Sequence, residues 1–289
     1  MINKEKRNAY IELSKPSILG LVLVTTALGY YLAGKGVRDW GILGWTLLGA
    51  ALTCAGAGAL NHYLERDSDA LMKRTKNRPL PKGILTPANA LAYGILMILV
   101  GVSLLCWKVN LLTAFLSLLT AFLYILVYTP MKKISWLNTT IGAIPGAIPP
   151  MGGWAAATGH LDPGAWVLFF ILFAWQHPHF YAIAWLCRED YAKAGFKMLP
   201  VVEPDGISTF RHAIFYCLML LCVSVLPFLM GMSGKFYLAG AVILGSGFVY
   251  AGWRLLCSHS MPDARRLLGA SVLYLPLLLF VIILDLSIL

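Results

Sequence analysis

Residues 111–129 read LLTAFLSLLTAFLYILVYT, a run of nineteen residues without Asp, Glu, Lys or Arg. A helix needs about 20 mostly apolar residues to cross a bilayer, and this run has that length. It is too continuous for a strand of a membrane β-barrel, in which apolar residues alternate over about ten positions. The stretch therefore predicts a membrane-spanning helix.

Further runs of this kind lie on both sides of it. The nine predicted spans are 18–35, 42–61, 88–107, 111–129, 138–158, 164–186, 211–230, 236–254 and 266–286. Charged residues make up 12% of the 289 residues, about half of the roughly 25% that a soluble domain carries. This excludes a soluble enzyme, a disordered chain and a nucleic-acid-binding protein. We expect an all-α, polytopic membrane protein with about nine transmembrane helices.

The basic residues indicate the orientation. If the N-terminus lies inside, 19 of the 23 Lys and Arg residues fall on inner segments, and four fall outside, namely Lys35, Arg38, Lys108 and Lys235. The positive-inside rule favours this arrangement. We therefore expect a multi-pass protein of the cell (inner) membrane with its N-terminus in the cytoplasm. The net charge of +10 then mostly reflects topology, and no nucleic-acid partner is expected.

Two long polar connections, at about 62–87 and 187–210, interrupt the apolar runs. Each passes from acidic through basic residues to a Leu-Pro pair, and these pairs, Leu80-Pro81 and Leu199-Pro200, lie 119 residues apart. Four predicted spans lie between equivalent points. The pattern predicts a single domain over 1–289 that contains an internal four-helix repeat.

Oxygen-bearing side chains lead into the first connection. If the second helix continues past residue 61, Asn61, Glu65 and Asp69 fall at i, i+4 and i+8 and share one face. Such side chains are poor neighbours for lipid and good ligands for Mg²⁺, which binds through one or two carboxylates together with substrate phosphates. The basic residues that follow, Lys73, Arg74, Lys76 and Arg78, supply partners for phosphate.

A plainer interpretation is a solvated inner loop whose acids only neutralise its bases. The helical spacing of the acids, and the recurrence of the pattern after the sixth span, favour function. Acids and bases on two inner loops predict a metal-bridged diphosphate site.

Four segments resemble a known family. They are 61–81, with its Glu-Arg-Asp-x-Asp and Arg-Thr-Lys-Asn-Arg; 128–133, with Tyr-Thr and Lys-Lys; 138–154, with Pro-Pro-Met-Gly-Gly-Trp; and 175–191, with Trp-Gln-His-Pro-His-Phe-Tyr. They are similar to the signatures of the UbiA-type intramembrane prenyltransferases. Within that family they most resemble the branch that attaches a farnesyl group to haem.

The resemblance implies helices around a lipid-open central cavity with a diphosphate site at its cytoplasmic end. It implies transfer of the farnesyl group of farnesyl diphosphate to a vinyl group of haem b, which gives haem O and diphosphate. Mg²⁺ is the implied cofactor, whereas haem b is a substrate. Membrane lipid is an expected contact, and partners could include proteins that modify haem or assemble an oxidase downstream.

The resemblance also assigns residues. Asn61, Glu65, Asp69 and Asp190 are the implied catalytic residues and hold Mg²⁺ with the diphosphate. Arg74, Arg78 and Lys133 are the implied contacts of the phosphates. The second motif is reduced, because position 186 is Leu and only Glu189 and Asp190 remain, which weakens the case for a second complete metal site.

Two histidines, His177 and His179, flank Pro178 within the sixth predicted span. An ionisable residue inside the membrane suggests function. His179, which the resemblance favours, could ligate haem iron, hold a propionate or act as a base. The alternative is a neutral buried histidine that is hydrogen-bonded between helices.

Two other functions compete with haem farnesylation. One is a related prenyltransferase that acts on an aromatic or quinone precursor, but such an acceptor gives no reason for the Trp-Gln-His-Pro-His-Phe-Tyr segment. The other is a transporter with an ion site at the membrane midplane. Nearly all the acids lie at the inner edge beside bases, which fits a diphosphate better than a transport pathway.

Overall fold

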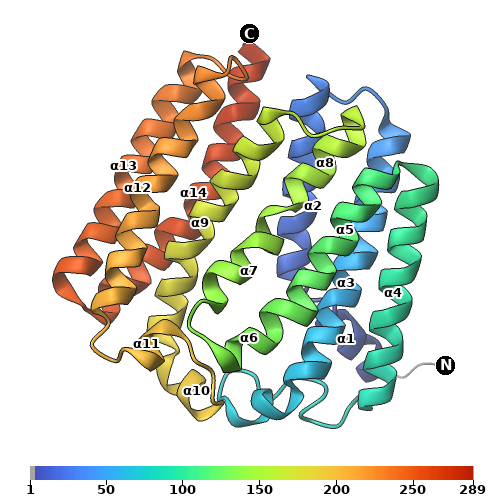
Figure 1. Cartoon of the computed structure of the whole chain (residues 1–289), viewed down its shortest axis with the longest axis vertical. Helices are drawn as coiled ribbons and strands as arrows, with labels where there is room; N and C mark the ends of the chain where they lie inside the picture. Colours follow the sequence, from blue (N-terminus) through green and yellow to red (C-terminus); the bar gives the residue numbers. More distant parts are fainter. Residues whose placement is uncertain (1–3, 289) are drawn as a thin grey trace. The chain divides into compact units, whose positions relative to one another are not determined.

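The structure is a computed structural model that describes the backbone of residues 4–288 and the side chains of residues 4–286. Every regular element in that range is helical (Figure 1). The elements are α1 (Lys4–Leu13), α2 (Pro16–Gly34), α3 (Trp40–Leu71), α4 (Pro87–Lys108), α5 (Leu111–Phe122), η1 (Leu123–Tyr128), α6 (Thr129–Ile134), α7 (Asn138–Ala147), α8 (Pro149–Thr158), α9 (Pro163–Leu186), α10 (Arg188–Lys193), α11 (Leu199–Val202), α12 (Ile207–Leu229), α13 (Lys235–Ser258) and α14 (Met261–Ile288).

The all-α prediction is confirmed, whereas the count of about nine spans is not. Among the described residues, eight helical stretches are long and apolar enough to cross a membrane. The predicted span 138–158 is instead two helices, α7 and α8, which are separated at Ile148. Pro149 and Pro150 follow this break, and a proline lacks the N–H group that would continue the helical hydrogen bonds. The N-terminus inside, the central cavity and the four-helix repeat stay predictions.

The helices belong to two compact units. The first comprises Met1–Ile134, Ile148–Leu161 and Asp190–Phe196. In this unit α3 packs along α4, and α2 packs against α8. Gly56 and Gly94 allow the close approach of α3 and α4, because a Cβ atom added at Gly56 would lie 2.5 Å from the Gly94 carbonyl oxygen.

The second unit comprises Ser135–Ala147, Asp162–Glu189 and Lys197–Leu289. Here α9 packs against α7, α12 and α14, and α13 packs against both α12 and α14. The buried carboxylate of Asp285, on α14, accepts hydrogen bonds from the backbone N–H groups of Gly234 and Tyr237, the latter at 3.0 Å. This carboxylate therefore caps the first turn of α13, where backbone N–H groups lack helical partners.

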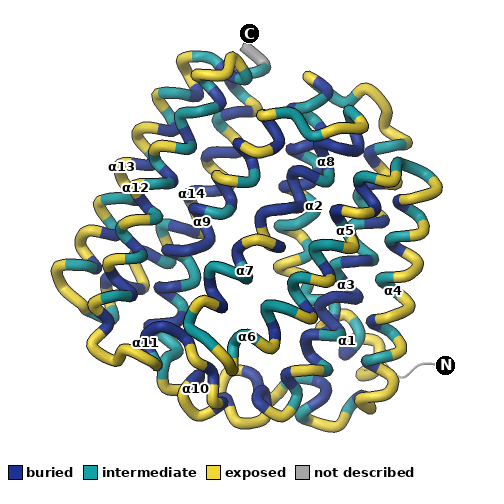
Figure 2. Tube along the Cα trace, viewed as in Figure 1, coloured by how far each residue is buried: buried dark blue, intermediate teal, exposed yellow. Residues whose placement is uncertain are grey.

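The long helices α4 and α13 have exposed stretches (Figure 2), and many of the exposed residues are large and apolar. Examples are Leu99 and Trp107 on α4 and Ile243 on α13, which are 60%, 81% and 71% exposed. Such surface would be unstable in water, but it suits contact with lipid. Together with the eight candidate spans, it identifies an integral membrane protein.

Two features of the first unit position polar groups. Helix α3 begins at an N-cap, Asp39, whose side chain accepts hydrogen bonds from the N–H groups of Gly41 and Ile42. It then runs ten residues beyond the predicted span end at residue 61, as the motif spacing requires. The second feature is the π-helical segment η1, in which the Thr129 N–H bonds the carbonyl of Tyr124, five residues earlier.

Candidate active site

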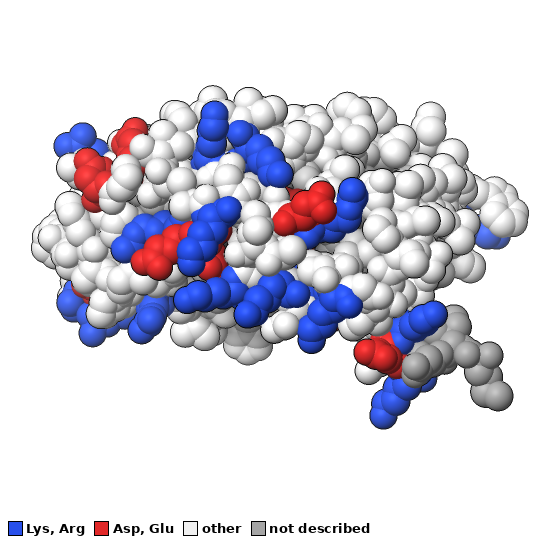
Figure 3. Space-filling model, turned by 90° about the horizontal axis from the view of Figure 1, so that it is seen from below, with Lys and Arg blue, Asp and Glu red and all other residues white. Residues whose placement is uncertain are grey.

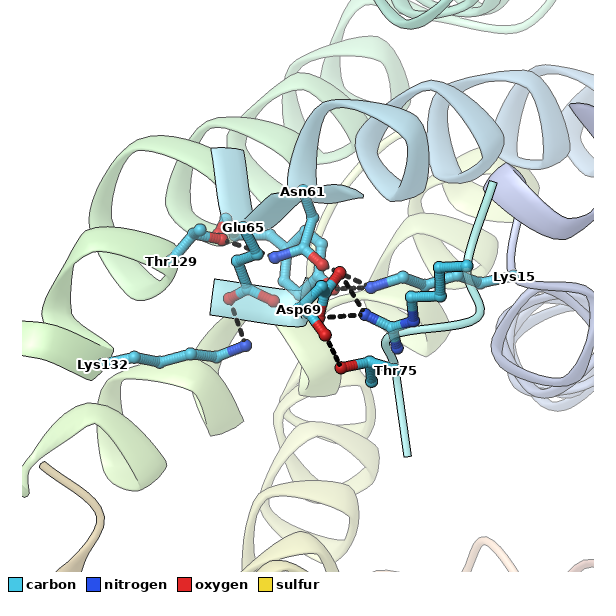
Figure 4. Close-up of polar contacts among 9 residues, drawn as sticks. Lys15, Asn61, Glu65, Asp69, Thr75, Thr129 and Lys132 are labelled. Atoms are coloured by element: carbon cyan, nitrogen blue, oxygen red, sulfur yellow. Dashed lines mark hydrogen bonds and ion pairs between the residues drawn. The ribbon is translucent and has the colours of Figure 1, made fainter. Parts of the chain in front are cut away.

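Three oxygen-bearing side chains line one face of α3 near its C-terminal end. Asn61, Glu65 and Asp69 are 0%, 6% and 0% exposed. Lys15 and Lys132 approach this face from opposite sides (Figure 4). The predicted spacing therefore holds, and the three side chains form one buried cluster.

Asp69 is bound by the loop that follows α3. Nη1 of Arg78 donates to both carboxylate oxygens, at 2.8 Å each. The Thr75 hydroxyl donates to the Asp69 backbone carbonyl at 2.9 Å, which folds this loop back onto the helix end. Arg78, predicted to contact phosphate, thus lies within the cluster, and its side chain is 20% exposed.

Glu65 is paired with Lys132, whose Nζ lies 2.6 Å from Oε1. Lys132 belongs to α6, directly after the π-helical segment. Its ammonium group also lies 4.6 Å from the ring centroid of Tyr128 and 5.7 Å from that of Phe196. Both distances fall within the range of cation–π attraction, so the rings help to hold the charge at this position.

Asn61 is fixed by contacts on both ends of its amide. Its Nδ2 donates to the Thr129 hydroxyl at 2.9 Å, and that hydroxyl donates to the carbonyl of Tyr124. Oδ1 therefore faces the other way, where it accepts a hydrogen bond from Lys15 Nζ at 2.5 Å. The same ammonium lies 3.0 Å from the Tyr124 hydroxyl.

Lys15 immediately precedes α2 and has a left-handed backbone conformation, with φ of 49°. Burial lowers the pKa of its ammonium to about 7, and the charge of Glu65 opposes that shift. Burial disfavours a charged group unless an opposite charge is near. An added anion beside Lys15 would therefore favour its charged form.

The other predicted site residues, Asp190, Arg74 and Lys133, lie outside the hydrogen-bonded cluster on α3. Asp190 Oδ2 lies 3.4 Å from the backbone nitrogen of Arg74, so the start of α10 meets the loop after α3. The side chains of Arg74 and Lys133 are exposed, and they are not part of the hydrogen-bonded cluster. Figure 3 shows acidic side chains lying beside basic ones in several places on the surface.

Sequence reasoning missed Lys15, Lys132, Tyr124 and Thr129. Lys132 could have been found from the sequence, because it adjoins Lys133 within the family-like segment 128–133. No spacing connects Lys15 with Asn61, 46 residues later.

The donor set fits Mg²⁺ that arrives with a diphosphate. Within the described part of the chain, no three His, Cys, Asp or Glu side chains could hold an ion by themselves. Two carboxylates and an amide oxygen are hard oxygen donors, and Mg²⁺ commonly completes its shell with phosphate oxygens and water. The cluster can therefore hold the ion in company with substrate.

The two histidines of α9, in the second unit, differ in their surroundings. His177 is fully buried, its Nδ1 lies 2.7 Å from the Phe173 carbonyl, and its ring stacks on Tyr216 at 3.6 Å. His179 is half-buried, and its Nδ1 lies 2.7 Å from the Ser271 hydroxyl.

The Ser271 hydroxyl fixes the state of the His179 ring. It lies 2.6 Å from the Leu268 carbonyl, which can only accept a hydrogen bond. The single hydroxyl proton is therefore used there, and His179 Nδ1–H must be the donor to Ser271. In the neutral ring this leaves the Nε2 lone pair free, the form in which histidine binds a metal or accepts a proton.

The chain is similar to known proteins along nearly its whole length. The model of the UbiA prenyltransferase family matches residues 22–281. A protein of Solibacter usitatus named Protoheme IX farnesyltransferase is 46% identical, with 96% of this chain and 98% of the relative covered. A protein of the same name from Salinibacter ruber is 47% identical, with the same coverage. These names match the haem-farnesylating branch that the sequence motifs predict.

Solved structures show the same fold. A structure described as digeranylgeranylglyceryl phosphate synthase has a TM-score of 0.83 at 19% identity, with 99% of this chain and 100% of that chain covered. A UbiA homologue from Archaeoglobus fulgidus, bound to DMAPP and Mg²⁺, has a TM-score of 0.70 at 17% identity, with 97% and 99% covered.

Proposed function

The chain belongs to the UbiA prenyltransferase family, and from this premise we propose that it transfers the farnesyl group of farnesyl diphosphate to a vinyl group of haem b. The relatives named for this activity cover nearly the whole chain. The observation that carries the proposal is the cluster on α3, in which three buried oxygen-bearing side chains face three basic side chains. Membership of the family leaves the transporter alternative without support.

Asn61, Glu65 and Asp69 would hold Mg²⁺ with the diphosphate, and Asp190 would join them from α10. The ion supplies neutralisation of the leaving group, which favours ionisation of an allylic diphosphate. Arg78 would also neutralise the leaving diphosphate. Its Nε and Nη2 groups do not bind Asp69 and can donate hydrogen bonds to phosphate oxygens. Arg74 and Lys133, which are exposed, would contact the outer side of the diphosphate.

The reaction breaks one bond of farnesyl diphosphate and forms two bonds at the vinyl group of haem b. The bond between C1 of the farnesyl chain and the diphosphate oxygen breaks, and the diphosphate leaves with the electron pair. The terminal vinyl carbon of haem bonds to C1, which moves the positive charge to the carbon beside the porphyrin ring. Water adds there and loses a proton, giving the hydroxyethylfarnesyl group of haem O. An apolar surrounding that excludes water until the C–C bond forms protects the allylic cation.

We assign the haem contact to His179, whose Nε2 is free while Ser271 holds Nδ1. His179 belongs to the second unit, and the α3 cluster belongs to the first. The active site would lie on the cytoplasmic side of the cell membrane, where the positive-inside rule places the charged loops.

One experiment tests the function. The purified protein is incubated with haem b, farnesyl diphosphate and Mg²⁺, and the haem is analysed by mass spectrometry. We expect a mass gain equal to a farnesyl group plus a hydroxyl group, absent when EDTA is added. A parallel reaction with an aromatic acid as acceptor tests the alternative that the protein prenylates an aromatic precursor. Prenylation of that acceptor, with unchanged haem, would refute the proposal.

A further inference from the structure

A row of polar side chains lies along the contact between α9 and α12, which pack side by side in the second unit (Figure 1). The row, here named the α9–α12 ladder, consists of His177, Tyr181 and Trp185 from α9 and Thr209, His212 and Tyr216 from α12. The three α9 members are four residues apart and therefore share one face of that helix.

The rings of the ladder contact one another across the two helices. His177 stacks on Tyr216, with 3.6 Å between the ring centroids, and Tyr181 lies 5.8 Å from His212. Along α9, the rings of His177 and Tyr181 are 6.1 Å apart. A step of four residues along α9 thus matches a step of four residues back along α12, so the two helices present their polar groups at successive shared levels.

Four polar atoms of the ladder are buried without a hydrogen-bond partner among the described residues. They are His177 Nε2, Tyr181 Oη, Trp185 Nε1 and Thr209 Oγ1, and the four residues are at most 7% exposed. A buried polar group that makes no hydrogen bond is costly, and ordered water commonly supplies the missing bonds. The ladder therefore offers the polar partners that internal water molecules require.

The two histidines of the ladder present hydrogen-bond acceptors. Nδ1 of His177 lies 2.7 Å from the Phe173 carbonyl, and Nδ1 of His212 lies 2.7 Å from the Ser208 carbonyl. A carbonyl only accepts, so in each neutral ring Nδ1 carries the hydrogen and Nε2 keeps its lone pair. The Tyr181 hydroxyl can both donate and accept. Water molecules beside these groups could pass a proton from one to the next, as histidine chains inside membrane proteins do.

One end of the ladder lies close to solvent. A Cβ atom added at Gly206 would lie 2.6 Å from the ring of Trp185, so this ring lies directly against the start of α12. The four residues before Gly206, 202–205, are exposed. From Trp185 to His177 the ladder covers eight residues of α9, or about 12 Å along the helix.

The other end of the ladder reaches a break in the hydrogen bonds of α9. His177 adjoins Pro178, which has no N–H group to donate to the Ala174 carbonyl one turn earlier. Such a freed carbonyl is a point at which water inserts into a helix. His179, to which we assign the haem contact, follows directly after the proline. The ladder thus connects exposed chain with the part of α9 that carries the haem assignment.

We propose that the α9–α12 ladder binds a chain of water molecules, which supplies the water that adds to the haem vinyl group and carries away the proton released. This inference rests on the proposed function, because that reaction consumes one water molecule and releases one proton. An apolar site that excludes water until the C–C bond forms needs a defined source of water afterwards.

The step conserves atoms and charge. A lone pair of the water oxygen bonds to the cationic carbon beside the porphyrin ring, and one O–H bond of that water breaks. The proton passes through water to Nε2 of His177 and then along the ladder to the exposed residues 202–205. The ladder residues act as a relay, whereas His179 keeps the assigned contact with haem.

The first experiment tests whether the ladder holds water, and it needs neither substrate nor variant. X-ray pulses generate hydroxyl radicals from water in place, and mass spectrometry then locates the oxidised side chains of the detergent-solubilised full chain. Tyr181 and Tyr237 are both 1% exposed, but the Tyr237 hydroxyl donates to the Ser224 carbonyl at 2.9 Å. We expect Tyr181 to be oxidised severalfold faster than Tyr237. Equal rates would overturn the water chain.

The second experiment tests the part that the ladder plays in the reaction. His177→Phe removes the ring nitrogens and keeps a ring against Tyr216, and Tyr181→Phe removes only a hydroxyl. Without relayed water, the cation is expected to lose a proton from the former terminal vinyl carbon, which gives an alkene lighter than the alcohol by one water. Proton transfer by positioned groups typically contributes about 100-fold or more, so we expect the ratio of alkene to alcohol to rise at least about tenfold in both variants.

Tyr237→Phe is the matched control, because it removes a buried hydroxyl outside the ladder; its product ratio should equal that of the unaltered protein. A loss of total turnover alone would accompany any structural defect, whereas the product ratio reports the fate of the cation. An unchanged ratio in folded Tyr181→Phe and His177→Phe proteins would overturn the relay. Failure of the proposed function gives a different result, namely no farnesylated haem of either mass from the unaltered protein.

Discussion

Replacing Arg78 with lysine tests whether this residue binds phosphate or only neutralises Asp69. The two N–H groups of Nη1 meet the two oxygens of Asp69, so three of the five N–H groups of the guanidinium remain for substrate. A lysine has three N–H groups and would keep one after pairing with Asp69. The substitution therefore removes up to two charge-assisted hydrogen bonds to phosphate while it conserves the charge.

Each such bond contributes about 1.5–3 kcal/mol. The loss of one such bond, about 1.5–3 kcal/mol, corresponds to binding that is about 10- to 150-fold weaker, and the loss of a second bond weakens it further. The assay is the dissociation constant of farnesyl thiodiphosphate, an unreactive analogue, in the presence of Mg²⁺, with thermal unfolding to confirm the fold. Arg66→Lys is the control, because Arg66 pairs with the exposed Asp67 at 3.7 Å. A folded Arg78→Lys protein with unchanged affinity would refute the assignment.

Three further predictions follow from the described contacts. Glu65→Gln should lower farnesyl transfer by about 100-fold or more while the protein stays folded; near-normal turnover would remove Glu65 from the site. His179→Ala should weaken haem binding and change the absorption spectrum of bound haem without changing metal-dependent diphosphate binding. Ser271→Ala should reproduce part of this effect. A less stable His179→Ala protein with a normal haem spectrum would indicate a structural role only. Asp285→Asn should lower the free energy of unfolding by about 1.5–3 kcal/mol and leave the activity of the folded protein intact, which a melting curve and a turnover assay check together.

The sequence predicted the parts of this protein that depend on local periodicity. Uncharged runs defined most of the spans, and the four-residue spacing of Asn61, Glu65 and Asp69 predicted their common face. It did not predict that the run 138–158 divides at Ile148. Hydropathy measures only how apolar the residues are, and it does not report the helical hydrogen bonds that Pro149 and Pro150 cannot make.

The missed residues depend on tertiary contacts. Lys15 reaches Asn61 from the residue immediately before α2, and no pattern along the chain predicts that contact. The choice between Lys132 and Lys133 depends on the rotation of α6 about its axis, which the π-helical segment sets. Asp285 had no apparent partner in the sequence, since its partners are backbone N–H groups at the start of α13.

The π-helical segment between α5 and α6 accommodates one residue more than a regular helix would in the same length. In an α-helix, consecutive residues are about 100° apart around the axis. If Leu123–Tyr128 became α-helical without losing a residue, everything that follows would turn by about that angle. Thr129 and Lys132 would then leave the α3 face, while Tyr124 stayed. The wide turn thus absorbs a one-residue insertion and keeps both side chains directed at the site, as π-bulges at functional sites often do.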